Sequence, residues 1–143
     1  MLGECKNLIK FPKILLDSIL SYNMSIMDYK RIYETIMNID PKIRLVTISD
    51  SNGKIMYSDH RQGVENLLTP EESKKSLELA INSWKTRTQL APKIGKGKYV
   101  LAEYERIKRI TMPLDDNHLL YITTELESDH TNLINKIQRL ELR

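Results

Sequence analysis

The sequence KIRLVTISDSNGKIMYS, residues 42–58, decides the fold of this chain. Two β-rich runs flank Asp50-Ser51-Asn52-Gly53, and Asn-Gly predicts a hairpin because both residues tolerate the positive φ of a primed turn. Side chains alternate between the two faces of a strand, so the first strand carries one set of residues on each face. One face takes Leu45, Thr47 and Ser49, and the other takes Arg44, Val46 and Ile48. This hairpin is the expected nucleus of an antiparallel sheet.

Composition describes an ordinary globular domain. The chain has 143 residues, of which 41% are hydrophobic and 29% charged, and this length fits one domain. The net charge of +3 is too small to indicate nucleic-acid binding by itself. A single cysteine, Cys5, excludes an internal disulfide and fits a reducing compartment, so we expect a cytoplasmic protein.

The N-terminal residues 1–24 are predicted to form an amphipathic helical extension, with a helix from about Pro12 to Tyr22. The apolar run Ile14–Leu20 is interrupted by Asp17 and is far shorter than the about 20 residues of a membrane span. Its apolar face has three possible partners: the domain itself, a second copy, or a membrane surface. We expect docking or dimerisation, and a single α+β domain over residues 25–143.

Helix signals stand on both sides of the hairpin. Ser25 begins a helix that ends at Asp40-Pro41, because the residue before proline avoids the α region. After a loop at 59–68, Thr69-Pro70-Glu71-Glu72 starts a helix to about Gln89 with a capping box. Its apolar positions at helical spacing form the predicted buried stripe. They are Leu77, Ala80, Ile81 and Trp84.

Three further strands and a last helix follow. The strands are predicted at residues 98–104, 107–113 and 118–124, separated by turn residues. Ser128 or Asp129 can cap the final helix. Its apolar stripe is Leu133, Ile134, Ile137 and Leu140. The order is helix, helix, two strands, helix, three strands, helix, which predicts an α+β fold with helices on the faces of a five-stranded antiparallel sheet.

This order of elements resembles the roadblock, longin and profilin-like group. The resemblance implies one sheet with strand order 2-1-5-4-3 and the third strand at an edge. PAS and Cache sensor domains have a similar sheet, and residues 48–58 resemble their opening hairpin. PAS domains usually carry several short helices between the hairpin and the later strands, whereas this chain has one.

A closer resemblance covers about Tyr29 to Ile137. Its short motifs are similar to a family of small archaeal proteins of unknown function, and they occur in the same order. The motifs lie at residues 40–44, 53–54, 60–64, 112–114 and 119–122. The resemblance implies no activity.

Sequence motifs give no catalytic grouping. Ser58, Asp59 and His60 have the residue types of a triad, but neighbours on an extended chain point to opposite faces. The histidines lack a metal-ligand spacing. Gly95-Lys96-Gly97-Lys98 precedes a strand, whereas a phosphate loop opens a helix. We therefore expect no catalytic residue, no metal and no cofactor.

Basic residues gather between Lys85 and Arg109. They form either a solvated edge or a docking patch for an acidic protein, an anionic ligand or nucleic acid; few aromatics accompany them, so nucleic acid is poorly supported. The candidate binding residues are Lys96, Lys98, Arg106 and Arg109. The first two and the last two are expected at different ends of a hairpin. Lys108 shares a face with apolar residues, and if that face is the core, its head is expected to extend to water.

Three functions fit these observations. A non-enzymatic, dimeric protein-interaction module is favoured, because the chain has an apolar extra helix and no active-site grouping. A small-molecule sensor of PAS or Cache type needs a cavity between the sheet and the helix over residues 71–89. An enzyme is the third, since a fold alone implies no activity.

Overall fold

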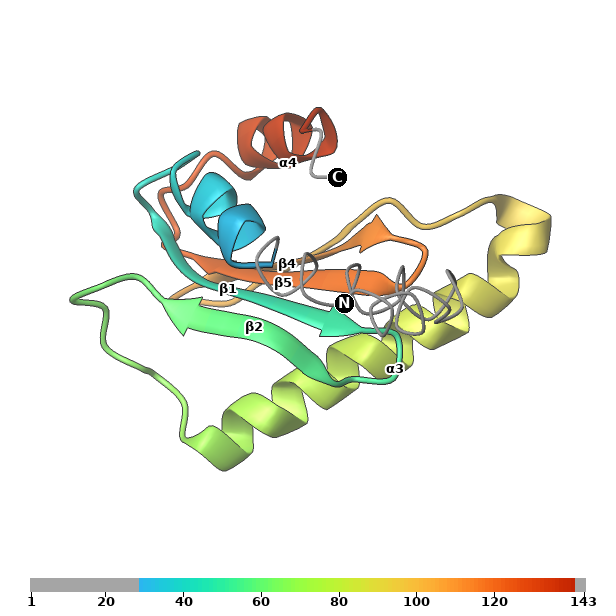
Figure 1. Cartoon of the computed structure of the whole chain (residues 1–143), viewed down its shortest axis with the longest axis horizontal. Helices are drawn as coiled ribbons and strands as arrows, with labels where there is room; N and C mark the ends of the chain where they lie inside the picture. The colour runs from blue at the N-terminus through green and yellow to red at the C-terminus, as the bar shows by residue number, and fades with distance from the viewer. Residues whose placement is uncertain (1–28, 141–143) are drawn as a thin grey trace, which may run out of the picture.

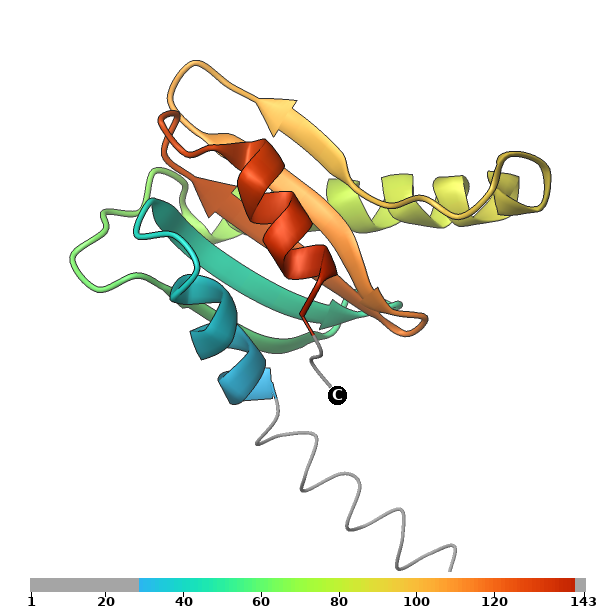
Figure 2. The same ribbon diagram turned by 90° about the horizontal axis from the view of Figure 1, so that it is seen from above.

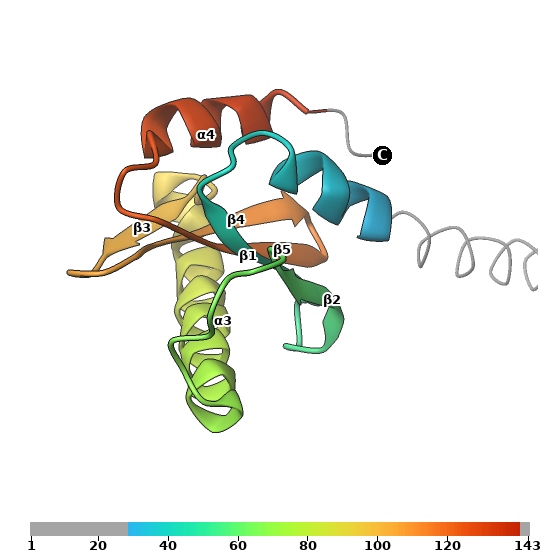
Figure 3. The ribbon, with the colours of Figure 1, turned by 90° about the vertical axis from the view of Figure 1, so that its left-hand side faces the viewer.

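The computed structural model describes residues 29–140 and contains the five-stranded antiparallel sheet that the sequence predicts, in the order β2-β1-β5-β4-β3 (Figure 1). Among the described elements, the helix of residues 29–37 and α4 cover one face and α3 covers the other (Figure 3). The labelled elements are β1 (Ile43–Asp50), β2 (Ile55–His60), α3 (Pro70–Ile94), β3 (Val100–Glu103), β4 (Lys108–Asp115), β5 (His118–Thr124) and α4 (His130–Gln138).

The β1–β2 hairpin forms as predicted, but its turn differs from the prediction. Among the described residues only glycines have positive φ, so Asn52 does not adopt the primed-turn conformation; Gly53 does, with φ +93°. The Asp50 carbonyl accepts a hydrogen bond from Gly53 N–H, and Asp50 N–H donates to the Lys54 carbonyl at 2.8 Å. This is a three-residue hairpin loop with glycine last. The Asp50 carboxylate also accepts from the N–H groups of Asn52 and Lys54, which favours this longer loop.

The face covered by two helices holds the main core. Residues from the 29–37 helix, the three strands β1, β4 and β5, and α4 bury their apolar side chains there. The alternation of side chains along β1 explains what this strand contributes to the core, because Val46 and Ile48 both point to this face. Fourteen of the described residues make up this core: Tyr29, Ile32, Ile36, Met37, Ile43, Val46, Ile48, Ile110, Met112, Leu120, Ile122, Leu133, Ile134 and Ile137.

The face covered by α3 is packed more sparsely. Four of the described residues form its core: Leu77, Ile81, Leu119 and Tyr121. Ala80 and Trp84 pack beside them, so the predicted stripe is confirmed. The capping box at Thr69 and Glu72 forms, with hydrogen bonds of 2.9 and 3.2 Å.

α3 is longer than predicted. It continues past Gln89 to Ile94 with Pro92 in its final turns, and its end projects beyond the sheet (Figure 2). Proline removes one N–H donor, yet Gly95 N–H still closes the helix on the Ala91 carbonyl at 2.8 Å. The additional residues are exposed, apart from half-buried Ala91, so they lengthen the helix without adding to the core.

The start of the loop after β2 also differs from the prediction, whereas one of the two predicted caps of α4 forms. Asp59 and His60 belong to β2, because they pair with Val46 and Leu45 of β1, and the loop therefore begins at Arg61. Asp129 caps α4 by accepting from Asn132 N–H at 3.1 Å. The predicted helix at Pro12–Tyr22 and the cap at Ser25 lie outside the described residues. The division at residue 24 stays a prediction.

Candidate functional site

Two pockets lie between the sheet and α3, and Ile81 borders both. The turn pocket, about 550 Å³, is formed by the β1–β2 and β4–β5 turns, the C-terminal half of α3 and residues 96–97. The sheet pocket, about 470 Å³, lies between the N-terminal half of α3, the sheet and residues 66–68. These volumes are typical of small-molecule sites, so the α3 face has the space that a sensor requires.

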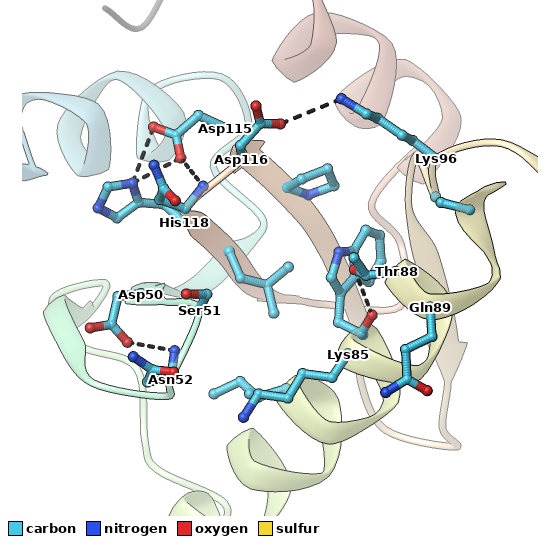
Figure 4. Close-up of a pocket in the computed structure, with 17 residues that line it drawn as sticks. Asp50, Ser51, Asn52, Lys85, Thr88, Gln89, Lys96, Asp115, Asp116 and His118 are labelled. Atoms are coloured by element: carbon cyan, nitrogen blue, oxygen red, sulfur yellow. Dashed lines mark hydrogen bonds and ion pairs between the residues drawn. The ribbon is translucent and has the colours of Figure 1, made fainter.

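The turn pocket carries both signs of charge (Figure 4). Asp50, Asp115 and Asp116 line it together with Lys85 and Lys96. Lys96 Nζ lies 3.6 Å from Asp116 Oδ1, but their side chains are 86% and 88% exposed, so this ion pair contributes little stability. The turn pocket is therefore not the basic patch that the sequence suggested.

Trp84 forms part of the wall of the turn pocket. A Cβ atom at Gly97 would lie 3.3 Å from ring atoms Cη2 and Cζ2 of Trp84. Glycine at this position therefore allows the chain to pass directly over the indole.

Tyr29, His118 and Asp115 form a hydrogen-bonded chain beside the turn pocket. Tyr29 Oη lies 2.7 Å from His118 Nε2, and His118 Nδ1 lies 2.9 Å from Asp115 Oδ1. Burial raises the pKa of the Tyr29 phenol, and the charges of Asp115 and Asp50 raise it further. The two hydrogen bonds fasten the 29–37 helix to the β4–β5 turn and the start of β5.

The sheet pocket has a row of four neighbouring residues as its floor. Arg109 of β4 pairs with Thr123 of β5, Thr123 with Leu45 of β1, and Leu45 with His60 of β2. All four residues line the pocket. The row crosses four adjacent strands, which places Arg109 and His60 at opposite sides of the pocket.

Arg109 lies between two tyrosine rings. Its guanidinium carbon is 5.1 Å from the ring centroids of both Tyr104 and Tyr121, and Nη1 donates to Tyr104 Oη at 3.1 Å. Burial raises the pKa of the Tyr121 phenol, and its bond to Ser76 and the charge of Arg109 oppose that rise. Tyr121 therefore remains a neutral ring against the cation.

The structure places the four predicted binding residues in two groups. Lys98 precedes β3 and Arg106 lies in the β3–β4 turn, and both are exposed. Because Val100 pairs with Thr111 and Glu103 with Lys108, these two positions lie at opposite ends of the hairpin. Lys96 is near the first and half-buried Arg109 near the second. The four do not form one patch.

Lys108 was predicted to extend to water, and this prediction is wrong. Its side chain is buried, and Nζ donates to the Ser128 carbonyl at 2.9 Å and lies 3.0 Å from His130 Nδ1. The start of α4 therefore satisfies the ammonium group in place of solvent.

Arg61 is a structural residue that sequence reasoning missed. Its Nε donates to the Ile43 carbonyl at 2.7 Å, and Nη2 donates to the carbonyls of Met37 and Asp40 at 2.8 Å. Carbonyls at the end of a helix need such donors. The position of Arg61 in the motif at residues 60–64 was the sequence signal that could have indicated this role. Its three hydrogen bonds to backbone carbonyls give that motif a structural role.

Ser58, the first of the three adjacent triad residue types, is hydrogen-bonded to a neighbouring strand and not to His60. Ser58 Oγ lies 2.7 Å from Thr47 Oγ1, with which it shares a hydrogen bond. In this part of the chain, no three histidine, cysteine, aspartate or glutamate side chains gather as metal ligands. Of the described helices, none combines the length and the apolar character needed to cross a membrane.

A shallow groove of about 120 Å³, the β3 groove, separates α3 from the edge strand β3. Leu79, Ser83 and Trp84 line its α3 side, and Ala102 and Tyr104 line its β3 side. Leu79 is 65% exposed and Tyr104 49% exposed. Exposed apolar side chains therefore lie beside a strand that is paired on one side.

The fold is that of solved Roadblock/LC7 domains and MglB proteins. Gliding protein MglB from Thermus thermophilus matches with 14% identity and a TM-score of 0.64, over 78% of this chain and 84% of its own. An MglB with a tetrameric arrangement matches with 14% identity and a TM-score of 0.64, over 78% and 83%. A Roadblock/LC7 domain from Streptomyces avermitilis matches with 12% identity and a TM-score of 0.58, over 73% and 84%.

At these identities the likeness establishes the fold alone. No protein-family model matches the sequence, and no curated protein matches it.

Proposed function

We propose that this chain is a non-enzymatic protein-interaction module that works as a homodimer joined through β3 and α3. The main observation in support is the edge strand β3, which is hydrogen-bonded to β4 on one side and flanked by exposed Leu79 and Tyr104. An unpaired strand edge is a template for pairing with another chain. Apolar side chains beside that edge add area that a second copy would bury.

The structural likeness supports an assembly of copies. One of the similar structures is an MglB with a tetrameric arrangement, so a protein of this fold does assemble. The predicted apolar face at Ile14–Leu20 is a further reason to expect self-association, although it lies outside the described residues.

Analytical ultracentrifugation over a range of concentrations tests this proposal. Leu79→Asp places a charge in the β3 groove and should weaken self-association by about tenfold or more. Ile55→Asp is the matched control, because Ile55 is also exposed but belongs to the opposite edge strand, β2. A species of 16.7 kDa at every concentration, or an equal effect of both substitutions, contradicts the proposed interface.

We further propose that the exposed basic residues steer an acidic protein partner. Lys96, Lys98 and Arg106 are exposed and suited to this role, whereas Arg109 is held by two tyrosines. Charges of this kind raise association rates, and salt screens them. Lys98→Glu with Arg106→Glu should weaken partner binding at low salt, while Lys30→Glu on the exposed surface of the 29–37 helix should not. Binding that survives both the double reversal and high salt contradicts this role.

A small-molecule sensor is the second candidate function, and the two pockets under α3 favour it. Native mass spectrometry of protein purified from its own host is the test, because it reports bound ligand and subunit mass together. A chain that carries no ligand and is stabilised by none in a metabolite screen contradicts this candidate. We also retain as proposals a cytoplasmic location and kinship with the small archaeal family.

A further inference from the structure

We propose that the sheet pocket binds an amphipathic organic carboxylate, with the carboxylate on Arg109 and the apolar body between the sheet and α3. This inference rests on the second candidate function, the sensor, and names its ligand class. Arg109 also lines the β3 groove, so the test below includes an outcome that assigns it to the interaction of β3 with a second copy.

Arg109 is a half-buried cation without an anionic partner in the described chain. No carboxylate of residues 29–140 lies within salt-bridge distance of its guanidinium, and its buried Nε has no hydrogen-bond partner there. Its Nη1 donates to the neutral Tyr104 hydroxyl. A cation withdrawn from water needs a counter-charge, and an external anion would provide it.

Arg44, which also lines this pocket, shows how the chain satisfies an arginine when it supplies the partners itself. Its Nη1 donates to both carboxylate oxygens of Glu125, at 2.7 and 2.9 Å, and Nη2 donates to the Glu65 carbonyl at 2.7 Å. Arg44 is therefore already paired with a carboxylate, and Arg109 is the guanidinium of this pocket that remains for an anionic ligand.

The side chain of Arg109 is held in position before any ligand binds. Tyr104 and Tyr121 hold its guanidinium between their rings, and Tyr121 is itself held by the Ser76 hydroxyl at 2.7 Å. A guanidinium fixed in this way loses little further conformational freedom on binding, and its planar fork matches the two oxygens of a carboxylate.

The rest of the pocket suits an elongated apolar body. From Arg109 the floor continues through Thr123 and Leu45 to His60, which is about 14 Å at the spacing of adjacent strands. Leu77 and Ile81 of α3 form the opposite wall. The Thr47 and Ser58 hydroxyls satisfy each other, so the polar groups in the middle of the floor need no ligand atom.

A single negative charge fits this pocket better than a phosphate. The N-terminus of α3 also borders it, but Thr69 and Glu72 already occupy the N–H groups of their capping box. Lys74 and Glu78 of α3 also line the pocket, but both are exposed and they carry opposite charges. Half-buried Arg109 is therefore the main anion-binding group, which favours a monoanion over a dianion.

The test is isothermal titration calorimetry of the full chain with decanoate and with decanol, its uncharged counterpart of equal length. We expect the unaltered protein to bind decanoate about tenfold more tightly than decanol, the size of one charge-assisted interaction. Arg109→Gln should remove this preference and leave decanol affinity unchanged. Lys98→Gln, an exposed basic residue outside the pocket, should change neither affinity.

The outcomes separate this inference from the sensor function. Equal affinities for decanoate and decanol in the unaltered chain overturn the carboxylate assignment and leave the sensor standing. Binding of neither, in a chain that binds another small molecule, overturns this use of the sheet pocket. Loss of self-association in Arg109→Gln, with no decanoate preference in the unaltered chain, assigns Arg109 to an interface between copies. If Arg109→Gln does not fold, Arg109→Lys and the two-ligand comparison in the unaltered chain decide the question.

Discussion

The two faces of the sheet are packed to different degrees. Fourteen of the described residues are buried under the 29–37 helix and α4, whereas four are buried under α3, a longer helix with a pocket on each side of Ile81. Burial of apolar surface is the main source of folding stability. The difference indicates that the first face holds the fold together and that the α3 face is the one with space for recognition.

The largest expected effect is at the centre of the densely packed face. Ile122 is fully buried on β5, which is paired with β1 on one side and β4 on the other, so Ile122→Ala leaves a cavity enclosed on all sides. We expect it to lower the free energy of unfolding by about 4–5 kcal/mol, the upper part of the range for such truncations. Urea unfolding followed by circular dichroism measures this change.

Ile81→Ala on the α3 face should lower the free energy of unfolding by less, about 2 kcal/mol. Ile81 borders both pockets, so its side chain makes fewer packing contacts than that of Ile122. The same urea unfolding measures it. Equal losses for Ile81→Ala and Ile122→Ala would remove the distinction between the faces. A loss below about 0.5 kcal/mol, the size of a surface substitution, would show that α3 faces the sheet differently.

A smaller effect is expected where the loop after the 29–37 helix meets the start of α4. Ser128 is buried, and its Oγ donates to Asp40 Oδ2 at 2.6 Å. Ser128→Ala removes this hydrogen bond to a carboxylate and should cost about 1–2 kcal/mol. Thermal unfolding at neutral pH checks it, with Ser83→Ala in the β3 groove as the control that should change little.

The smallest effect is a dependence on pH from Asp40. Burial by itself would raise the pKa of this carboxyl, but hydrogen bonds from Ser128 and Lys42 and the charges of Lys42 and Arg61 hold the pKa below its usual value of 3.8. The carboxylate therefore stabilises the fold fully above about pH 4, and this contribution disappears as the pH falls through the lowered pKa. Stability measured from pH 6 to pH 2 should fall less steeply in Asp40→Asn. Identical slopes would contradict the role of Asp40.

Local signals in the sequence predicted most of the fold. The capping box at Thr69, the hairpin around Asn52-Gly53 and the alternation in β1 each depend on a few residues, so they can be recognised in the sequence, although the conformation of the turn was not. The order of strands came from the resemblance to known folds. The end of α3 was missed because Pro92 favours a break, whereas the helix continues through it with the loss of one N–H donor.

The candidate site was less predictable, because it depends on contacts between distant residues. Lys108 meets His130 across 22 positions, and nothing near Lys108 in the sequence indicates that partner. Arg109 was correctly noted as a basic residue, but its position against Tyr121 follows from the pairing of β4 with β5. The pockets depend on how closely α3 approaches the sheet, which periodicity does not determine.

The contact between Gly97 and Trp84 has an optical consequence. Trp84 is the single tryptophan of the chain, and it lines both the turn pocket and the β3 groove but not the sheet pocket. The wavelength of its maximum fluorescence emission should therefore shift when a molecule enters the turn pocket or a second copy covers β3. A ligand confined to the sheet pocket has no direct contact with the indole and should leave its emission maximum unchanged. Tryptophan emission therefore distinguishes binding in the sheet pocket from binding at the other two sites on the α3 face.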